Sequence, residues 1–172
     1  MVELKALDLH WFEGSEEERD LCAHSSVYLK IGIKSISDEK AGDWTVSASA
    51  YYFLKSLKET HDGSIEPQLI PCCGFNMYVV GDNNDELLIL GCPNGINWTI
   101  LHKPNKIIHQ FENGEIIETD FDEWRDVVCN FSDEIMNFYE ISLPKVVDDE
   151  EDRKGFELFM KEWKRLRIEA FN

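Results

Sequence analysis

The sequence is poor in basic residues and has no long apolar run. Its 17 Lys and Arg residues stand against 34 Asp and Glu residues, so the net charge is −17. A surface this negative repels nucleic-acid phosphate, and we expect no DNA or RNA ligand. No stretch approaches the roughly 18 apolar residues of a membrane span, and residues 1–12 show no basic segment followed by an apolar one. These absences predict a cytoplasmic protein with no membrane partner.

The short motifs that hold metals, nucleotides or catalytic nucleophiles are also missing. The sequence contains no C-x-x-C or H-x-x-x-H pair, no G-x-S-x-G elbow, and no G-x-G-x-x-G or Walker loop. We therefore expect neither a cofactor nor a bound metal. If that expectation fails, the first suspected metal ligands are Cys22, His24, Cys72, Cys73 and Cys92.

The chain needs no disulfide to stabilise its fold. At 172 residues a domain buries roughly 70% of the surface that its unfolded chain exposes, which is enough for a sizeable core. The five cysteines are an odd number, and we expect them to stay reduced. No internal repeat or Gly/Ser linker interrupts the chain, and the only candidate boundary is the charged connector 144–152. These features predict one domain over residues 1–172.

Apolar periodicity predicts strands and one helix in the first half of the chain. Alternating apolar residues indicate strands over 3–12 and 21–36, which would form a first hairpin. Helical spacing indicates an amphipathic helix over 44–60 with Asp43 as its N-cap. Turn residues then separate the strands of a β-meander, expected at 75–80, 86–90, 96–102, 106–112 and 115–119.

The end of the meander and the C-terminal segment carry the clearest local signals. Asn113-Gly114 predicts a two-residue type I′ turn. A helix should begin at Asp120, with Glu123 reaching back in a capping box, and a second helix should cover about 150–170. The expected fold is α+β, an antiparallel β-meander sheet packed against about three amphipathic helices.

Two groups of residues could carry chemistry. Asp8 and His10 would share one face of the first strand, where a nearby Ser or Cys would complete a nucleophile triad. Cys22 and His24 share a strand face in the same way, and with the remaining Cys and His residues they could serve a hydrolase or bind zinc. The competing explanations are a surface charge pair and ordinary buried cysteines.

The acidic residues form two clusters. One lies in segment 13–20, and the other surrounds the last predicted hairpin; the members of the latter are Glu112, Glu115, Glu118, Asp120, Asp122 and Glu123. Dense carboxylates speed the encounter with a basic protein. A hairpin and a helix start hold charges on fixed backbone, whereas a loop loses conformational entropy on binding. We therefore predict that the hairpin cluster contacts a basic partner, while solubility alone is the competing explanation.

Five stretches resemble segments of a bacterial family of uncharacterised small acidic proteins: LCAHSSVYL, DWTVSASAYYFLKSL, LIPCCGFNMY, GCPNGINWTILH and GFELFMKEWKRLR. In size, charge and α+β layout the chain is similar to the immunity proteins that neutralise bacterial polymorphic toxins. The resemblance implies a non-catalytic module that masks a basic toxin or another basic protein, and it carries over no binding residue. A hydrolase-type or zinc-dependent enzyme is the alternative, and a scaffold role is a third.

Overall fold

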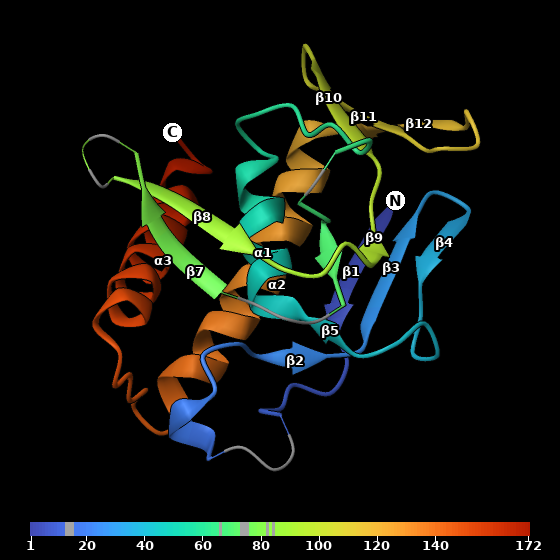
Figure 1. Cartoon of the computed structure of the whole chain (residues 1–172). Helices are drawn as coiled ribbons and strands as arrows, with labels where there is room; N and C mark the ends of the chain where they lie inside the picture. Colours follow the sequence, from blue (N-terminus) through green and yellow to red (C-terminus); the bar gives the residue numbers. More distant parts are fainter. Residues whose placement is uncertain (13–15, 66, 73–75, 82, 84) are drawn as a thin grey trace.

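A computed structural model describes residues 1–12, 16–65, 67–72, 76–81, 83 and 85–172 (Figure 1). It confirms the expected α+β class. Its α-helices are α1 (Val46–Lys55), α2 (Phe121–Ile141) and α3 (Glu150–Glu169), and a short 3-10 helix, η1, covers Glu17–Arg19. Within the described ranges, no helix is both long and apolar enough to cross a membrane.

The N-terminal strands form a small antiparallel sheet with the order β1-β3-β4. Its members are β1 (Val2–Ala6), β3 (Val27–Ile31) and β4 (Lys34–Ser37). The predicted pairing of the first two strands is present, with Leu4 opposite Leu29. The first strand is shorter than expected, and beyond it His10 forms only an isolated bridge with His24.

The expected meander strands are divided among separate antiparallel sheets. One sheet holds β10 (Thr99–Lys103), β11 (Lys106–Gln110) and β12 (Ile116–Asp120) in sequence order. A second pairs β7 (Asn76–Val80) with β8 (Glu86–Leu90), and a third pairs β6 (Ile70–Pro71) with β9 (Gly95–Ile96). Residue 75, where the first meander strand was expected to begin, lies outside the described residues.

The two-residue turn predicted at Asn113-Gly114 is wrong. The N–H of Phe111 donates to the Glu115 carbonyl oxygen at 2.9 Å, which leaves residues 112–114 in the loop. Gly114 has a φ of 81°, whereas Asn113 does not adopt a positive φ. A type I′ turn needs a positive φ at both positions. The longer loop needs a positive φ only at Gly114.

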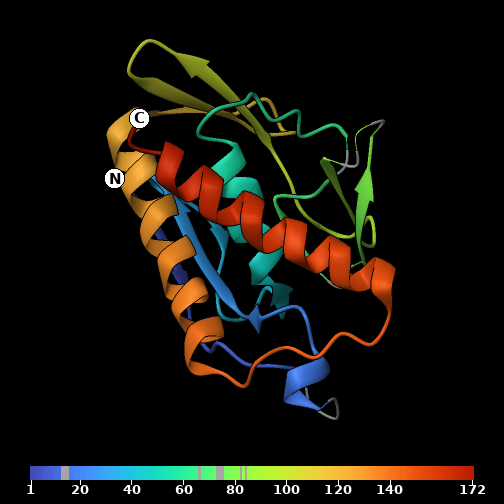
Figure 2. The ribbon, with the colours of Figure 1, turned by 90° about the vertical axis from the view of Figure 1, so that its left-hand side faces the viewer.

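Helix α1 lies at the centre of the molecule, between the strands and the two longer helices (Figures 1 and 2). Every residue from Val46 to Leu54 is buried, because α2 and α3 cover one side of α1 and β-structure covers the rest. The predicted N-cap at Asp43 is wrong. Trp44 and Thr45 instead form a two-residue strand, β5, which pairs with β2 (His24–Ser25) and delays the helix start.

Helix α2 begins where the sequence predicts, but its capping box is absent. Asp120 occupies the N-cap position, and its carboxylate pairs with Lys106 Nζ at 2.8 Å rather than with the helix backbone. The Glu123 carboxylate accepts the N–H of Val2 at 2.8 Å. These two side chains tie the helix start to β11 and β1, so tertiary contacts replace the local cap.

Helix α3 packs closely on β7 and belongs to the same core as α1 and α2. A Cβ atom at Gly155 would lie 1.8 Å from the Met77 carbonyl oxygen, so glycine is required at this crossing. The buried stripe of the helix includes Phe159 and Trp163, and the indole N–H of Trp163 donates to Ser132 Oγ of α2. The predicted helix is therefore present, and its apolar residues face the core.

Candidate functional site

The carboxylates predicted to contact a partner are largely paired within the protein. Five of the six form ion pairs, with N to O distances of 2.6 to 3.1 Å: Glu115 with Lys34, Glu118 with Lys103, Asp120 with Lys106, Asp122 with Arg125, and Glu123 with the amino group of Met1. Glu112 has no such pair in the described part of the chain. Such exposed pairs contribute little to stability, but they reduce the charge that a partner meets. That this cluster contacts a partner stays a prediction.

Two other acidic segments come together at one end of the molecule. Segment 16–20, which contains η1, lies beside segment 140–154, which joins α2 to α3 (Figures 1 and 2). These segments carry ten carboxylates and four basic side chains, a net charge of −6. We call the ten carboxylates the acidic pole: Glu16, Glu17, Glu18, Asp20, Glu140, Asp148, Asp149, Glu150, Glu151 and Asp152.

Hydrogen bonds hold the two segments of the acidic pole against each other. The N–H of Val146 donates to the Glu18 carbonyl oxygen at 2.7 Å. The N–H of Leu143 donates to the Glu17 carboxylate at 2.9 Å, and the ammonium of Lys145 donates to the Glu17 carbonyl oxygen at 2.6 Å. These contacts fix residues on both sides of the acidic pole, so its charges are held on ordered backbone.

The order of residues 16–20 removes the reason for preferring the hairpin cluster as the contact surface. The sequence predicted a loop over 13–20 that would lose entropy on binding. Residues 16–20 contain a 3-10 helix and are bonded to the connector, so the entropy cost does not apply to them. Residues 13–15 lie outside the described residues.

A cluster of aromatic side chains around Trp11 packs against the acidic pole. The Trp11 ring stacks on Phe138 with centroids 4.8 Å apart and meets the edge of Tyr139 at 5.0 Å. The ammonium of Lys145 lies 3.0 Å from the centre of the Trp11 ring. Burial lowers the pKa of Lys145, against the opposing effect of Asp20. The cluster therefore packs Trp11 against α2 and against Lys145 of the acidic connector.

Most carboxylates of the acidic pole form no ion pair with Arg or Lys in the described part of the chain, and apolar side chains are exposed around them. Three of the ten carboxylates form ion pairs with Arg or Lys in the part of the chain that the structure describes: Glu16, Asp148 and Glu150. The exposed apolar side chains nearby are Phe12, Ile141, Leu143 and Val146, with exposed fractions between 46% and 74%. Unneutralised carboxylates around exposed apolar groups are the arrangement expected of a surface that binds a basic protein.

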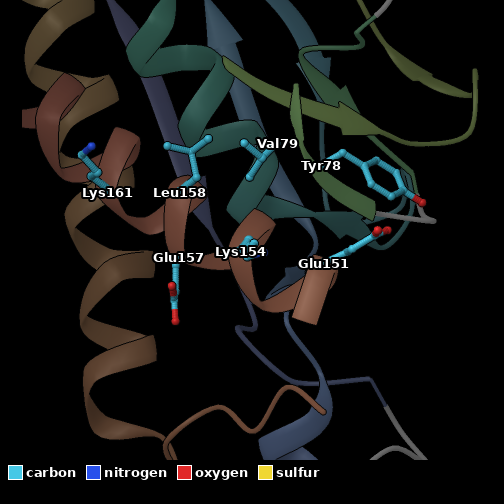
Figure 3. Close-up of a pocket in the computed structure, with 7 residues that line it drawn as sticks. All are labelled: Tyr78, Val79, Glu151, Lys154, Glu157, Leu158 and Lys161. Carbon is cyan, nitrogen blue, oxygen red and sulfur yellow. The ribbon is translucent and has the colours of Figure 1, made fainter. Parts of the chain in front are cut away.

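A groove of about 580 Å³ runs between α3 and β7 and reaches the acidic pole at Glu151 (Figure 3). Tyr78 and Val79 form the β7 side, and the α3 side is formed by Glu151, Lys154, Glu157, Leu158 and Lys161. The four charged side chains are exposed to solvent and balance one another. Burial is the usual means of shifting a catalytic pKa, and it is absent at these four groups. The described lining of the groove therefore offers no buried ionisable side chain.

The nucleophile arrangement suspected at Asp8 and His10 does not form. His10 Nδ1 contacts the Asp8 carbonyl oxygen at 2.7 Å, and Nε2 contacts the Asp43 carboxylate at 3.3 Å. Burial acts to lower the pKa of His10, but the Asp8 and Asp43 oxygens outweigh it and raise the pKa. The Asp8 carboxylate bonds to Ser25 and Ser26 instead. Both imidazole nitrogens thus face oxygens rather than a nucleophile.

The suspected cysteine and histidine ligands are only partly brought together. Cys22 is buried, and its desolvation raises the pKa of the thiol to about 12, which disfavours the reactive thiolate. His24 is half-buried, and burial lowers its pKa. Cys72 and Cys92 meet, with 2.7 Å between their sulfurs, whereas Cys73 lies outside the described residues. Among the residues that are described, no group of three or more His, Cys, Asp or Glu could hold a metal ion.

Any conclusion about function must rest on this geometry, because comparisons with known proteins found no match. No protein-family model, curated protein or solved structure matches the chain. The similarity to immunity proteins therefore stays a prediction from the sequence.

One histidine is fully buried in the core and serves the fold. The indole N–H of Trp98 donates to His109 Nδ1 at 3.1 Å, and His109 Nε2 lies 3.1 Å from Thr119 Oγ1. The Trp124 ring meets the imidazole edge to face at 4.8 Å. Since Nδ1 accepts a hydrogen bond, the imidazole is neutral. Burial lowers the pKa of His109 to about 4.

The neutral His109 makes stability depend on pH. The unfolded chain binds a proton at this residue below about pH 6.5, whereas the folded protein resists it down to about pH 4. The contribution of His109 to the free energy of unfolding is therefore fully present above pH 6.5, and we expect about 3 kcal/mol of it to be lost as the pH falls toward 4. Urea unfolding at several pH values measures this loss. His109→Gln should reduce the loss. Equal pH dependence in wild type and His109→Gln would contradict the assignment.

Proposed function

We propose that the protein is a non-catalytic binding module that masks a basic protein with its acidic pole. The observation that carries this proposal is the meeting of two acidic segments, distant in sequence, whose carboxylates mostly have no Arg or Lys partner in the described ranges. The hairpin cluster differs, because nearby cations such as Lys34, Lys103 and Lys106 pair with most of its carboxylates. The acidic pole is therefore the stronger source of attraction for a positively charged partner.

Charge and apolar surface have separate roles in such a complex. Carboxylates steer a basic partner toward the surface and raise the rate of association. Once the partner is seated, burial of exposed apolar side chains such as Ile141 and Leu143 slows dissociation. Both features occur at the acidic pole. A basic toxin, as the resemblance to immunity proteins implies, is the partner class that fits this surface.

A hydrolase-type or zinc-dependent enzyme remains the alternative and has less support. Its suspected nucleophile Cys22 is buried, and the nitrogens of His10 face two oxygens. Stoichiometric zinc in the purified protein, or unfolding of the protein by EDTA, would favour the alternative.

A capture experiment with matched charge variants tests the proposal. Wild type, Glu140→Lys with Glu151→Lys, and Glu112→Lys with Glu118→Lys are each immobilised and exposed to a lysate of the native cells. Both double variants change the net charge by the same amount; they differ in where the charge is reversed and in that the hairpin variant also breaks the exposed ion pair between Glu118 and Lys103. We expect a protein with a high isoelectric point to be retained by wild type and the hairpin variant and lost from the pole variant. Equal retention by all three, or capture of nucleic acid alone, would contradict the proposal.

A further inference from the structure

The contact between Cys72 and Cys92 lies away from the acidic pole and has no part in the proposed function. Their sulfur atoms are 2.7 Å apart, so the two side chains are in direct contact and only a small shift separates them from the length of a disulfide bond. Cys72 follows β6 and Cys92 follows β8, so the two residues bracket the β7–β8 hairpin. A link between them would close the base of that hairpin.

Backbone pairing holds the two cysteines in this position. β6 and β9 are antiparallel, with Pro71 opposite Gly95, and the N–H of Cys72 donates to the Asn94 carbonyl oxygen at 3.1 Å. The strands approach so closely at Gly95 that a Cβ atom there would lie 2.5 Å from the Ile70 carbonyl oxygen. The approach of the two sulfurs is therefore built on paired backbone and on a glycine that permits the crossing.

The pair is also open to a small reagent. Cys72 and Cys92 are half-buried rather than buried, in contrast to Cys22. Cys92 lies on the wall of a cavity of about 190 Å³ that Pro71 and Leu90 also line. A low-molecular-weight disulfide can approach this side of the protein without unfolding it.

We propose that Cys72 and Cys92 form a reversible disulfide by exchange with a low-molecular-weight disulfide. The thiolate of one cysteine attacks a sulfur of the reagent, which breaks the reagent's S–S bond and releases one thiol. The thiolate of the other cysteine then attacks the protein sulfur of this mixed disulfide and releases the second thiol. Two protein thiols thus lose two electrons and two protons, and one molecule of the reagent is reduced to two thiols. The product is a covalent closure of the β7–β8 hairpin.

Equilibration with glutathione buffers tests the proposal. The full-length protein is incubated over a range of ratios of oxidised to reduced glutathione, quenched with a maleimide and mapped by mass spectrometry. We expect wild type and Cys73→Ser to take up two fewer maleimide groups than the fully reduced protein, with no glutathione adduct, and the mapped bridge to join Cys72 to Cys92. Cys72→Ser and Cys92→Ser should not form it. Reducing agent should reverse the change, and the bridged protein should melt roughly 5 °C higher than the reduced protein.

The cysteine next to Cys72 provides the sharpest contrary outcome. A bridge that uses Cys73, and that Cys73→Ser abolishes, would overturn the proposal. So would thiols that all remain reactive at every buffer ratio, or a glutathione adduct that never resolves into a bridge. A bridged protein that melts below the reduced one would show that the two cysteines are not held ready to pair, which also contradicts it.

Discussion

Replacing Trp163 by alanine is expected to lower the free energy of unfolding by about 4 kcal/mol, which corresponds to a fall in Tm of about 10 °C. Trp163 is 1% exposed and lies where α3 meets α2. Its ring packs against Phe159 with centroids 5.3 Å apart and against Tyr139 at 6.1 Å. Alanine would leave a cavity that these neighbours cannot close, and it would leave the buried Ser132 hydroxyl without its indole donor.

Two further variants separate packing from hydrogen bonding and from general effects on the helix. Trp163→Phe keeps most of the apolar volume but removes the bond to Ser132, so we expect a loss of about 1–2 kcal/mol. Ile168→Ala changes an exposed apolar side chain of the same helix and should alter stability by less than about 0.5 kcal/mol. Urea unfolding measures all three. A small effect of Trp163→Ala would mean that α3 is an appendage rather than part of the core.

The helices could be predicted from the sequence because their signals are local. The apolar stripe that contains Phe159 and Trp163 repeats at helical spacing, and the structure buries both residues. The capping box was mispredicted because Glu123 has a better partner in Val2, which is distant in sequence. Asp43 is not the N-cap for a similar reason, because Trp44 and Thr45, which follow it, form β5 and pair with β2. Local rules identify the elements, and tertiary contacts determine their ends.

The sequence predicts where most strands lie, but not all of their bounds or their pairing. The strand expected over 21–36 is divided into β2, β3 and β4, and the one expected over 96–102 is divided between β9 and β10. A turn between two strands favours a hairpin, and this holds for β7 with β8 and for β10 to β12. The link between these groups passes through β9, which pairs with β6 instead of extending the meander. Gly95 permits that close crossing. A glycine before an apolar strand is too common a signal to predict such an approach.

The candidate site shows the same limit. Segments 13–20 and 148–152 are both visibly acidic in the sequence. The sequence marks the second only as part of the charged connector 144–152, and in the structure Asp149 of this segment is the N-cap of α3. Their meeting depends on contacts such as Val146 to Glu18 that no local pattern announces. The ion pair between Lys34 and Glu115, which reduces the negative charge of the hairpin cluster, likewise joins segments that are distant in sequence.

Reversing charge at the acidic pole is expected to slow association with the basic partner by about tenfold at low salt. Glu140 and Glu151 are suitable positions because both are exposed and neither forms an ion pair with another described residue. The hairpin variant, Glu112→Lys with Glu118→Lys, should slow association by less than about threefold, since only the overall charge acts from that distance. Raising the salt concentration should reduce the difference between the two variants, because salt screens exposed charges.

The most direct test of the acidic pole is the association rate constant of the captured basic protein with these three proteins, measured by stopped-flow fluorescence from low to physiological salt. We expect wild type to associate fastest and to depend most steeply on salt, the hairpin variant to stay close to it, and the pole variant to be about tenfold slower with a shallower salt dependence. If the hairpin variant is slowed as much as the pole variant or more, or if none of the rates depends on salt, the acidic pole is not the surface that binds the partner.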